Sequence, residues 1–495
     1  MFEKVLVANR GEIACRIIRA AKRLGIKTIV VYSEADKDMP FVQAADERWA
    51  LGGALAKDSY LNRAAILEAA KASKAEAIHP GYGFLAEDAG FAHEVAQAGL
   101  IFIGPSVDTM LRIHDKSAAR LLVKAAGVPV VPGSNGQVAD VEAACVVAAT
   151  LGYPVLCKAA GGGGGIGMAS AANESELRRA FVSCQQRSLA AFGNPGVYLE
   201  RFFEAPRHVE VQLLADRHGH CIHLGERECS IQRRHQKIIE EAGSPLFEGG
   251  AYAKLREGML RAALCVAAAF NYSNVGTVEF LVSGEEFFFI EFNARLQVEH
   301  PITELTTGVD LVAAQFHMAA GMPLQLQQSN IASHGHAIEF RLCAEDPIKF
   351  LPSPGEIKRL EFPPEGGAHC PSKGNPLLLL NTSPVPMATA LRGEGGEVAS
   401  CVRIDSGYAQ GSRVTPYYDS LLAKIIVHAP TRALAIEKAR QALSECHVEG
   451  IKTNLPLHRQ IVEDADFQAG RLTTRFLERF SKKRAAPMPL KETGL

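Results

Sequence analysis

Residues 4–33 read KVLVANRGEIACRIIRAAKRLGIKTIVVYS, with an apolar run at each end and a helical pattern between them. Four apolar residues of the middle part recur at the spacing of one helix face: Ile13, Ile17, Ala21 and Leu24. Gly25 follows as a typical helix stop, and residues 27–33 form the second apolar run. A strand, a helix and a second strand in this order predict a parallel sheet.

A dinucleotide-binding unit begins in the same way, and Glu34 or Asp36 could bind its ribose. The fingerprint of that unit needs three glycines at the first turn, whereas the turn ANRGEIA contains Gly11 alone. NAD binding is therefore disfavoured. Further strand-like segments extend this open α/β region to about residue 112.

Composition and charge restrict the class of protein. The chain has 495 residues, and its 53 basic and 54 acidic side chains leave a net charge of -1. No global field would attract nucleic acid or an anionic membrane, so neither is expected as a partner. The N-terminal segment fits no targeting peptide, and 11 scattered cysteines form no C-x-x-C pair. These features predict a cytoplasmic protein.

The glycine run PVLCKAAGGGGGIGMAS, residues 154–170, offers backbone N–H groups that could approach phosphate oxygens closely. Lys158 precedes the glycines, whereas a Walker A lysine follows them and a kinase lysine lies on the next strand. Both of those classes are disfavoured. A flexible linker stays open, but a lysine at a strand end favours a mobile loop that covers phosphates.

The segment TVEFLVSGEEFFFIEF, residues 277–292, reads as a hairpin. A three-residue loop would place Glu279 opposite Glu291 on one face, and a two-residue loop would split them between faces. Opposed carboxylates repel unless a cation lies between them. With Asn293 on the same side, these oxygens suit magnesium, although a solvated strand face is the alternative.

The same face would continue through Arg295, Gln297 and Glu299 if the extended conformation persists to Pro301. Arg295 could bind a planar oxyanion in a bidentate manner, and its charge would keep Glu299 ionised at neutral pH.

A basic cluster lies in CSIQRRHQKIIEEA, residues 229–242. The acidic pair that follows and the lack of interleaved aromatic residues disfavour nucleic-acid binding. A solvated patch stays open for Arg233, Arg234, His235 and Lys237.

Together these segments resemble the biotin carboxylases, a branch of the ATP-grasp ligases. The resemblance covers nearly residues 1–470 and rests on VLVANRGEIACRIIRAAKRLG, HPGYGFLAED, GGGGGIGM, RHVEVQLLAD, CSIQRRHQK, EFNARLQVEHPITELTTGVDL, CAEDP, YDSLLAKIIV and GIKTNL.

The resemblance implies α/β and α+β architecture in three domains. These are an N-terminal open parallel α/β domain at 1–112, an ATP-grasp core at 113–333 and a C-terminal biotin carboxylase domain at 334–470. The core would carry a mobile glycine-rich lid at about 130–201. Residues 364–400 form an atypical insertion, and residues 471–495 are expected to be a disordered tail.

The resemblance also implies roles for single residues. The nucleotide would contact Lys116, Lys158, Gly163, Gly164, Gly165, Met168, Glu200, Arg201, Phe203, His208, Gln232, His235, Gln236 and Leu281. Magnesium or manganese would be held by Glu279, Glu291 and Asn293. Bicarbonate would bind Lys237, Arg295 and the chain at Gln297 and Val298, with Glu299 as its general base and Arg341 stabilising the biotin enolate.

The implied reaction is attack of bicarbonate on the γ-phosphate of ATP to form carboxyphosphate, followed by carboxyl transfer to N1′ of biotin. The chain has no Met-Lys-Met biotinylation signature, so biotin is expected on a separate carrier protein, with a separate carboxyltransferase downstream. A homodimer is an option within the family. The final acceptor stays open among acetyl-CoA, propionyl-CoA, another acyl-CoA, pyruvate and urea.

Two other functions compete with this one. Another ATP-grasp ligase would join a carboxylate to an amine. A catalytically silent nucleotide-binding subunit is the second alternative, because Ile166 stands where many family members carry a basic lid residue and because residues 364–400 form an atypical insertion. His114 is a further departure, since it replaces a usual glycine.

Overall fold

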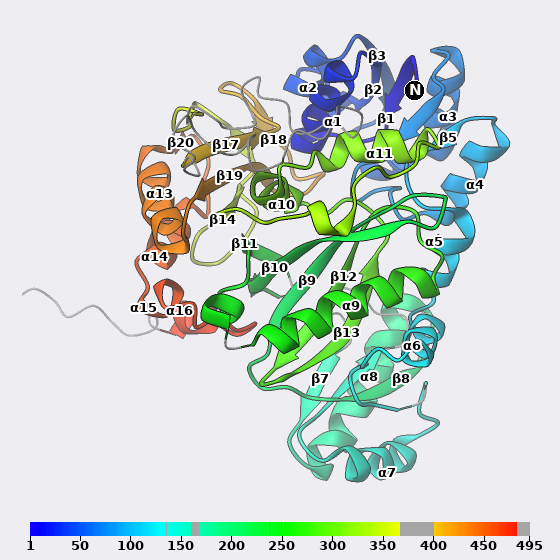
Figure 1. Cartoon of the computed structure of the whole chain (residues 1–495), viewed down its shortest axis with the longest axis vertical. Coiled ribbons are helices and arrows are strands. Elements are labelled where there is room, and N and C mark those ends of the chain that lie inside the picture. Colours follow the sequence, from blue (N-terminus) through cyan, green and yellow to red (C-terminus); the bar gives the residue numbers. More distant parts are fainter. Residues whose placement is uncertain (135, 160–167, 235, 251, 367–399, 483–495) are drawn as a thin grey trace, which may run out of the picture.

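The computed structural model describes residues 1–134, 136–159, 168–234, 236–250, 252–366 and 400–482 (Figure 1). The lid glycines Gly163, Gly164 and Gly165, His235 and most of the predicted insertion lie outside the described residues.

The N-terminal region contains a five-stranded parallel sheet in the order β3-β2-β1-β4-β5. Its strands are β1 (Lys4–Val7), β2 (Lys27–Ser33), β3 (Glu47–Gly52), β4 (Ala77–His79) and β5 (Ile101–Phe102). The helices of this region are α1 (Gly11–Arg23), α2 (Pro40–Ala44), α3 (Arg63–Ala72), α4 (Ala89–Gln97) and α5 (Val107–His114). The parallel sheet predicted from residues 4–33 is confirmed. Ile13, Ile17 and Ala21 lie on the buried side of α1, and Leu24 follows as the C-cap and packs, partly buried, against the same core.

An eight-stranded antiparallel sheet forms the centre of the molecule, in the order β13-β12-β9-β10-β11-β14-β19-β17. Its strands are β9 (Arg207–Ala215), β10 (Cys221–Arg233), β11 (Gln236–Ala242), β12 (Asn274–Ser283), β13 (Glu286–Asn293), β14 (His336–Cys343), β17 (Cys401–Ser406) and β19 (Leu421–Ala429). Because β14 pairs with β11, the sheet runs without a break across the boundary that we predicted at residue 333. Side chains from the predicted second and third domains therefore share one sheet.

Helices cover this sheet, and short strands flank it. The helices are α9 (Ala253–Ala269), α10 (His300–Thr307), α11 (Leu311–Ala319), α13 (Arg432–Glu445) and α14 (Leu455–Val462). The short strands are β15 (Gly355–Glu356), β16 (Arg359–Glu361), β18 (Arg413–Val414) and β20 (His447–Glu449). Helix α10 packs against β10, β11, β14 and β19, so residue 299, just before it, is delivered to the middle of the sheet.

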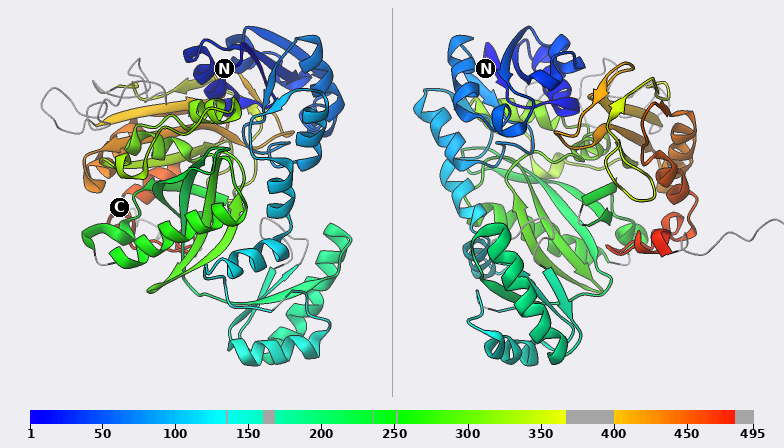
Figure 2. Two further views of the ribbon diagram at one scale, coloured as in Figure 1. Left: turned by 45° about the vertical axis from the view of Figure 1, so that its right-hand side comes forward. Right: turned by 180° about the vertical axis from the view of Figure 1, so that it is seen from behind.

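A smaller lobe contains the three-stranded sheet β7-β6-β8 and projects from the rest of the chain (Figure 2). Its elements are β6 (Val155–Ala159), β7 (Met168–Ala171), β8 (Val197–Arg201), α7 (Val141–Leu151) and α8 (Glu174–Phe192), and α6 (Lys116–Ala125) leads into it. The lobe has an apolar core of its own that includes Leu177 and Phe181. It corresponds to the region that we predicted as the lid.

The C-terminal segment departs from the prediction of a disordered tail from residue 471. Leu472 is 1% exposed and Phe476 is 4% exposed, and both belong to the main apolar core. The backbone N–H of Thr474 donates to the carbonyl of Pro206, ahead of β9. The prediction was wrong for residues 471–482, where α16 (Glu478–Lys482) follows α15 (Ala465–Gln468), because these apolar residues are buried against the core. Residues 483–495 lie outside the described part.

Among the described residues, no helix has both the length and the apolar character that a membrane crossing requires.

Candidate active site

The hairpin of β12 and β13 has a two-residue turn at Gly284 and Glu285, because Ser283 pairs with Glu286. By the alternation of strand side chains, this turn alone would split Glu279 and Glu291 between faces. A β-bulge shifts the register between the pair Phe280–Phe289 and the pair Glu279–Glu291, however, so that the two glutamates oppose each other. The predicted opposition is confirmed, but our reason for it, a three-residue loop, was wrong.

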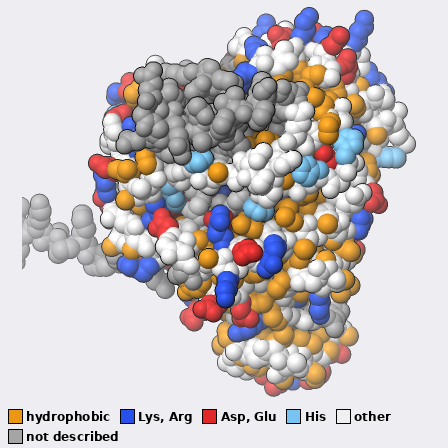
Figure 3. All heavy atoms as spheres, in the orientation of Figure 1, with side chains coloured by type: hydrophobic (Ala, Val, Ile, Leu, Met, Phe, Trp, Pro, Cys, Tyr) orange, Lys and Arg blue, Asp and Glu red, His pale blue; other side chains and the backbone are white. Residues whose placement is uncertain are grey.

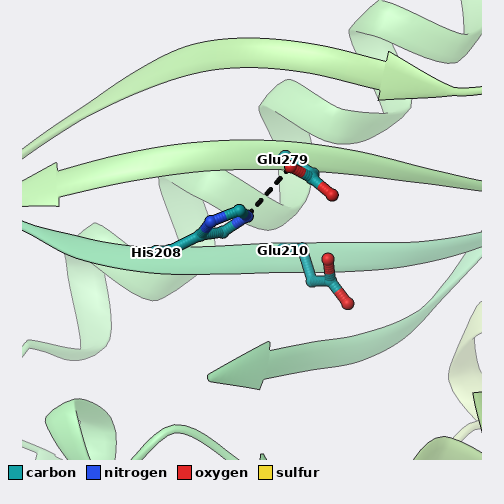
Figure 4. A group of neighbouring side chains, drawn as sticks. All are labelled: His208, Glu210 and Glu279. Atoms are coloured by element: carbon teal, nitrogen blue, oxygen red, sulfur yellow. Dashed lines mark ion pairs between the residues drawn. The ribbon is translucent and has the colours of Figure 1, made fainter. Parts of the chain in front are cut away.

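A row of charged residues crosses four strands at this level. Glu291 pairs with Glu279, Glu279 with Glu210 on β9, and Glu210 with Arg227 on β10. Figure 4 shows Glu279 and Glu210 on neighbouring strands beside His208, whose Nε2 lies 3.0 Å from Glu279 Oε2. Three acids in a row repel one another, so this part of the sheet depends on cations that enter from other elements.

Lys237 on β11 supplies the central cation. Its Nζ lies 2.5 Å from Glu210, 2.8 Å from Glu279 and 2.7 Å from Glu299. Burial would lower the pKa of Lys237, but the three carboxylates outweigh that effect and raise it well above its usual value. The ammonium group is therefore charged at neutral pH and neutralises part of the acidic row.

Glu299 lies between two cations. It is 0% exposed, and its oxygens accept hydrogen bonds from Lys237 (2.7 Å) and from Nη2 of Arg341 on β14 (2.9 Å). Burial would raise the pKa of Glu299, but Lys237, then Arg341 and Arg227, lower it well below its usual value. We attributed this ionisation to Arg295, whose charge does interact favourably with Glu299, but the larger effects come from Lys237, Arg341 and Arg227.

Arg295 is directed elsewhere. Its Nε donates to Glu87 (2.8 Å), Nη2 to the Asn293 side chain (3.0 Å) and Nη1 to Gln297 Oε1 (3.1 Å). The strand ends at Asn293 and a turn precedes α10, so the extended conformation that we predicted up to Pro301 does not occur. The side chains still meet, because Asn293 and Gln297 both donate to Glu279 Oε1, at 2.9 and 3.4 Å.

The predicted phosphate-binding lysines each contact a carboxylate. Lys158 Nζ lies 2.5 Å from Glu200, to which Arg120 also donates, at 3.1 Å. Lys116 Nζ lies 3.5 Å from Glu291 and so links α6 to the acidic row. Lys158 and Glu200 both belong to the lobe, so only Lys116 joins the acidic row directly.

The other predicted nucleotide residues are more dispersed. Phe203 stacks on Phe288 at 5.1 Å between ring centroids, and Arg201 lies over Phe203. Within the described parts of the chain, the side chains of Gln232 and Gln236 form no hydrogen bond to the acidic row, and Met168 and Leu281 are apolar.

The basic cluster of residues 233–237 does not form a common patch. Arg233 is paired with Glu345 at 2.6 Å, while Lys237 points into the acidic row. On the face drawn in Figure 3, basic and acidic side chains are interspersed rather than gathered by sign.

Sequence analysis missed several members of the site. Glu210 and Arg227 complete the charged row, and Glu240 accepts from Arg341 Nε at 2.6 Å. The alternation of His208, Glu210 and Gln212 in RHVEVQ was a usable signal for Glu210. Lys424 on β19 carried no signal, since only the fold brings its Nζ within 2.9 Å of the Val298 carbonyl.

Besides the cluster of Glu210, Cys229 and Glu299, whose two acids Lys237 already bridges, two acidic groupings could hold a divalent cation. His208, Glu210 and Glu279 bring ligand atoms within 4.8 Å of one another, but Lys237 already lies between the two acids and would repel a second cation there. Glu279 and Glu291 are opposed across the hairpin, and Asn293 reaches Glu279. The oxygen atoms of this second set fit magnesium or manganese, which prefer hard ligands.

Family models match most of the chain. The model described as "Biotin carboxylase, N-terminal domain" matches residues 1–110, and "Carbamoyl-phosphate synthase L chain, ATP binding domain" matches residues 115–327. "Biotin carboxylase C-terminal domain" matches residues 395–479.

Known proteins resemble the chain over nearly its whole length. Biotin carboxylase 2 of Bacillus subtilis (strain 168) is 47% identical over 479 residues, which cover 97% of this chain and 99% of that protein. A Campylobacter jejuni biotin carboxylase, solved as a beta-gamma-ATP complex, superposes with a TM-score of 0.86 at 41% identity and covers 97% of this chain and 99% of its own. The biotin carboxylase domain dimer of Hydrogenobacter thermophilus 2-oxoglutarate carboxylase, solved with MgADP, ADP and bicarbonate, has a TM-score of 0.85 at 43% identity, covering 97% and 98%.

Proposed function

The chain belongs to the biotin carboxylase family, and from that premise we propose how its residues divide the reaction among them. The enzyme carboxylates biotin with bicarbonate at the expense of ATP, and it uses magnesium. One observation carries the assignment of roles. Lys237 contacts three carboxylates, and Arg341 contacts the last of these, Glu299.

The cations around Glu299 would bind bicarbonate, and Glu299 itself would activate it. Lys237 and Arg295 offer positive charge on either side of Glu279, and Gln297 extends the polar surface toward the turn before α10. An ionised Glu299 can accept the bicarbonate proton as the bicarbonate oxygen bonds to the γ-phosphorus of ATP and ADP leaves. Arg341 contacts the other oxygen of Glu299 and would stabilise the enolate oxygen of biotin.

The nucleotide would lie between the sheet and the lobe. Lys116 and Lys158 would exchange their present carboxylate partners for phosphate oxygens, which is a favourable exchange for an ammonium group. The lobe would then cover the phosphates and keep water from the carboxyphosphate. Phe203 supplies an aromatic face for the adenine side.

Magnesium would be held by Glu279 and Glu291 with Asn293, and it would neutralise charge on the phosphates when bound. We expect Glu291→Gln to raise the magnesium concentration needed for half-maximal turnover at least tenfold, because one anionic ligand becomes neutral. Titration of the steady-state rate with magnesium at saturating ATP measures the change.

The matched control for this variant is Glu286→Gln, an exposed acid on the same hairpin. It should leave the magnesium dependence unchanged. Equal magnesium requirements in Glu291→Gln and the parent enzyme would place the metal elsewhere, with the His208 grouping as the next candidate.

Free biotin should accelerate phosphate release from ATP only when bicarbonate and magnesium are both present, since all three reactants meet at one site. A coupled phosphate assay with each reactant omitted in turn measures this. ADP formation that proceeds without bicarbonate when an amine is supplied would instead favour a carboxylate–amine ligase.

Biotin would reach this site on a carrier protein, and a carboxyltransferase would pass the carboxyl group onward. The chain resembles both a Bacillus subtilis biotin carboxylase and a domain of a 2-oxoglutarate carboxylase to similar extents, so we assign the choice of acceptor to the carboxyltransferase. The second of these neighbours is described as a dimer, which supports a homodimer as a proposal for this chain.

A further inference from the structure

Two buried glutamates face each other beside the site, and among the described residues no hydrogen-bond donor reaches the second of them, Glu339. Glu240 on β11 pairs directly with Glu339 on β14, so their side chains leave the sheet on the same face. Both residues are 0% exposed. Side chains at directly opposed antiparallel positions lie close, with Cβ atoms about 4.5–5.5 Å apart. The sheet thus brings two carboxyl groups together away from water.

The hydrogen bonds of the pair are incomplete. Glu240 Oε1 accepts from Arg341 Nε at 2.6 Å, whereas Glu240 Oε2 has no partner among the described residues. Both oxygens of Glu339 also lack a partner within the described chain. A buried carboxylate without a donor is costly, and two side by side are costlier still. One proton between them would pair Glu240 Oε2 with one oxygen of Glu339 and remove the repulsion of two charges, since a protonated carboxyl group can donate to its neighbour.

We propose that Glu339 is a positioning residue, which carries the proton of this carboxyl pair, donates it in a hydrogen bond to Glu240, and so holds Glu240 against Arg341. The inference rests on the role proposed above for Arg341 at the biotin enolate. Arg341 reaches Glu299 with the same guanidinium group that Glu240 orients. Glu339 therefore acts on the reaction through two intermediate side chains and touches no substrate.

The electrostatic surroundings agree with a shared proton. Burial raises the pKa of Glu240 to about 7, although Arg341 lowers it. Burial also raises the pKa of Glu339 well above its usual value, against the effect of Lys424. The charged and titratable groups around the pair are Arg341, Lys424, Lys237, Glu299 and Cys229. Loss of the proton at high pH would leave two repelling carboxylates and would release Glu240 from its fixed position.

The neighbouring acid on β11 provides a contrast. Glu241 points to the opposite face and is satisfied by Arg432 at 2.7 Å and by His336 at 2.7 Å. Burial opposes its ionisation, but Arg432 and His336 lower the pKa of Glu241 to about 2. Glu241 thus has cationic partners and needs no shared proton, whereas Glu240 has one oxygen on Arg341 and the other without a partner among the described residues, on the side of an acid.

The substitution Glu339→Gln tests the proposal, because its amide N–H can still donate to Glu240 but cannot ionise. We expect this variant to keep near-parent kcat at pH 7 and to lose less activity than the parent enzyme as the pH rises to 9. Glu339→Leu removes the donor and should lower kcat about tenfold, the scale of one hydrogen bond to a charged group. Biotin-dependent phosphate release across the pH range measures both variants.

Glu241→Gln is the matched control for losing a buried carboxylate, on the neighbouring strand β11. It should reduce thermal stability without changing the shape of the pH profile. Superimposable alkaline limbs in Glu339→Gln and the parent enzyme would overturn the proposal.

Infrared spectroscopy of the parent enzyme tests the proton without any variant. A carboxylic acid C=O band that persists at pH 7 and disappears in Glu339→Gln is expected, and absence of the band in the parent would also overturn the proposal. The proposed role of Arg341 is tested by a different variant. Unchanged biotin-dependent turnover in Arg341→Met would refute that role, whereas the infrared band would still show whether Glu339 carries the proton.

Discussion

Glu299→Gln is expected to lower kcat for biotin-dependent ATP cleavage by about 10²–10⁴-fold, the range typical of a removed general base. The amide keeps the size of the side chain but cannot accept the bicarbonate proton. ATP binding should change little, because Glu299 contacts Lys237 and Arg341 rather than the lysines assigned to the phosphates. Steady-state kinetics and equilibrium nucleotide binding on the same preparation separate the two effects.

Glu228→Gln is the matched control for this substitution. Glu228 is also buried, but it accepts hydrogen bonds from Arg207, Ser230 and Ser244, away from the acidic row. It should retain parent turnover apart from any loss of stability. Turnover that is unaffected in Glu299→Gln, with tight ATP binding, would contradict the proposed base and favour a chain that binds nucleotide without catalysis.

The pH dependence follows from the same contacts. Because Lys237 and Arg341 depress the pKa of Glu299, the base is already ionised well below neutral pH. Its contribution to stability is present above the unfolded-state pKa of about 4.3 and is lost as the pH falls through the lower folded-state value. The acidic limb of kcat/KM between pH 5 and 7 should therefore not arise from Glu299.

Lys237→Met should destabilise the fold by about 3–5 kcal/mol, because removing one partner of a buried ion pair leaves uncompensated charge. Here three carboxylates lose their common cation, and the pKa values of Glu279 and Glu299 would rise. Biotin-dependent turnover should become undetectable, since the bicarbonate site loses its main cation. Chemical denaturation and the phosphate assay measure the two losses.

Lys237→Arg and Lys254→Met serve as controls. The arginine keeps a positive charge beside the acids and should restore part of the stability relative to Lys237→Met, but little of the activity, because a planar guanidinium group cannot contact all three acids as the ammonium does. Lys254 is exposed on α9, and its loss should change neither property. A Lys237→Met enzyme as stable as the parent would show that the acidic row does not depend on this ammonium.

Secondary structure and the pairing of nearby residues could be predicted from the sequence wherever they depended on a short segment. The apolar spacing of α1 and the two runs beside it predicted the parallel sheet, and the glutamates of the hairpin were identified as an opposed pair. The reason for the opposition was not predictable, because the bulge that corrects the register depends on how β12 and β13 pack in the full sheet.

The conformation after Asn293 was also predicted incorrectly. Strand alternation suggested one continuous face, yet the chain turns and begins α10, and Arg295 pairs with Glu87 more than 200 residues earlier in sequence. Alternation describes a strand only as long as neighbouring strands continue to pair with it. The same limit explains residues 471–482, whose apolar side chains appeared isolated in sequence and are buried against distant elements.

The sequence by itself determined the family, the classes of side chain at the site and the chemistry they can perform, because each of these depends on residue identity and short spacing. Only the tertiary structure decided which charges meet. Lys237 reaches Glu210, Glu279 and Glu299, and Glu240 faces Glu339, because one sheet joins segments that are far apart in sequence. Electrostatic energy depends on distance and burial, and a linear sequence specifies neither.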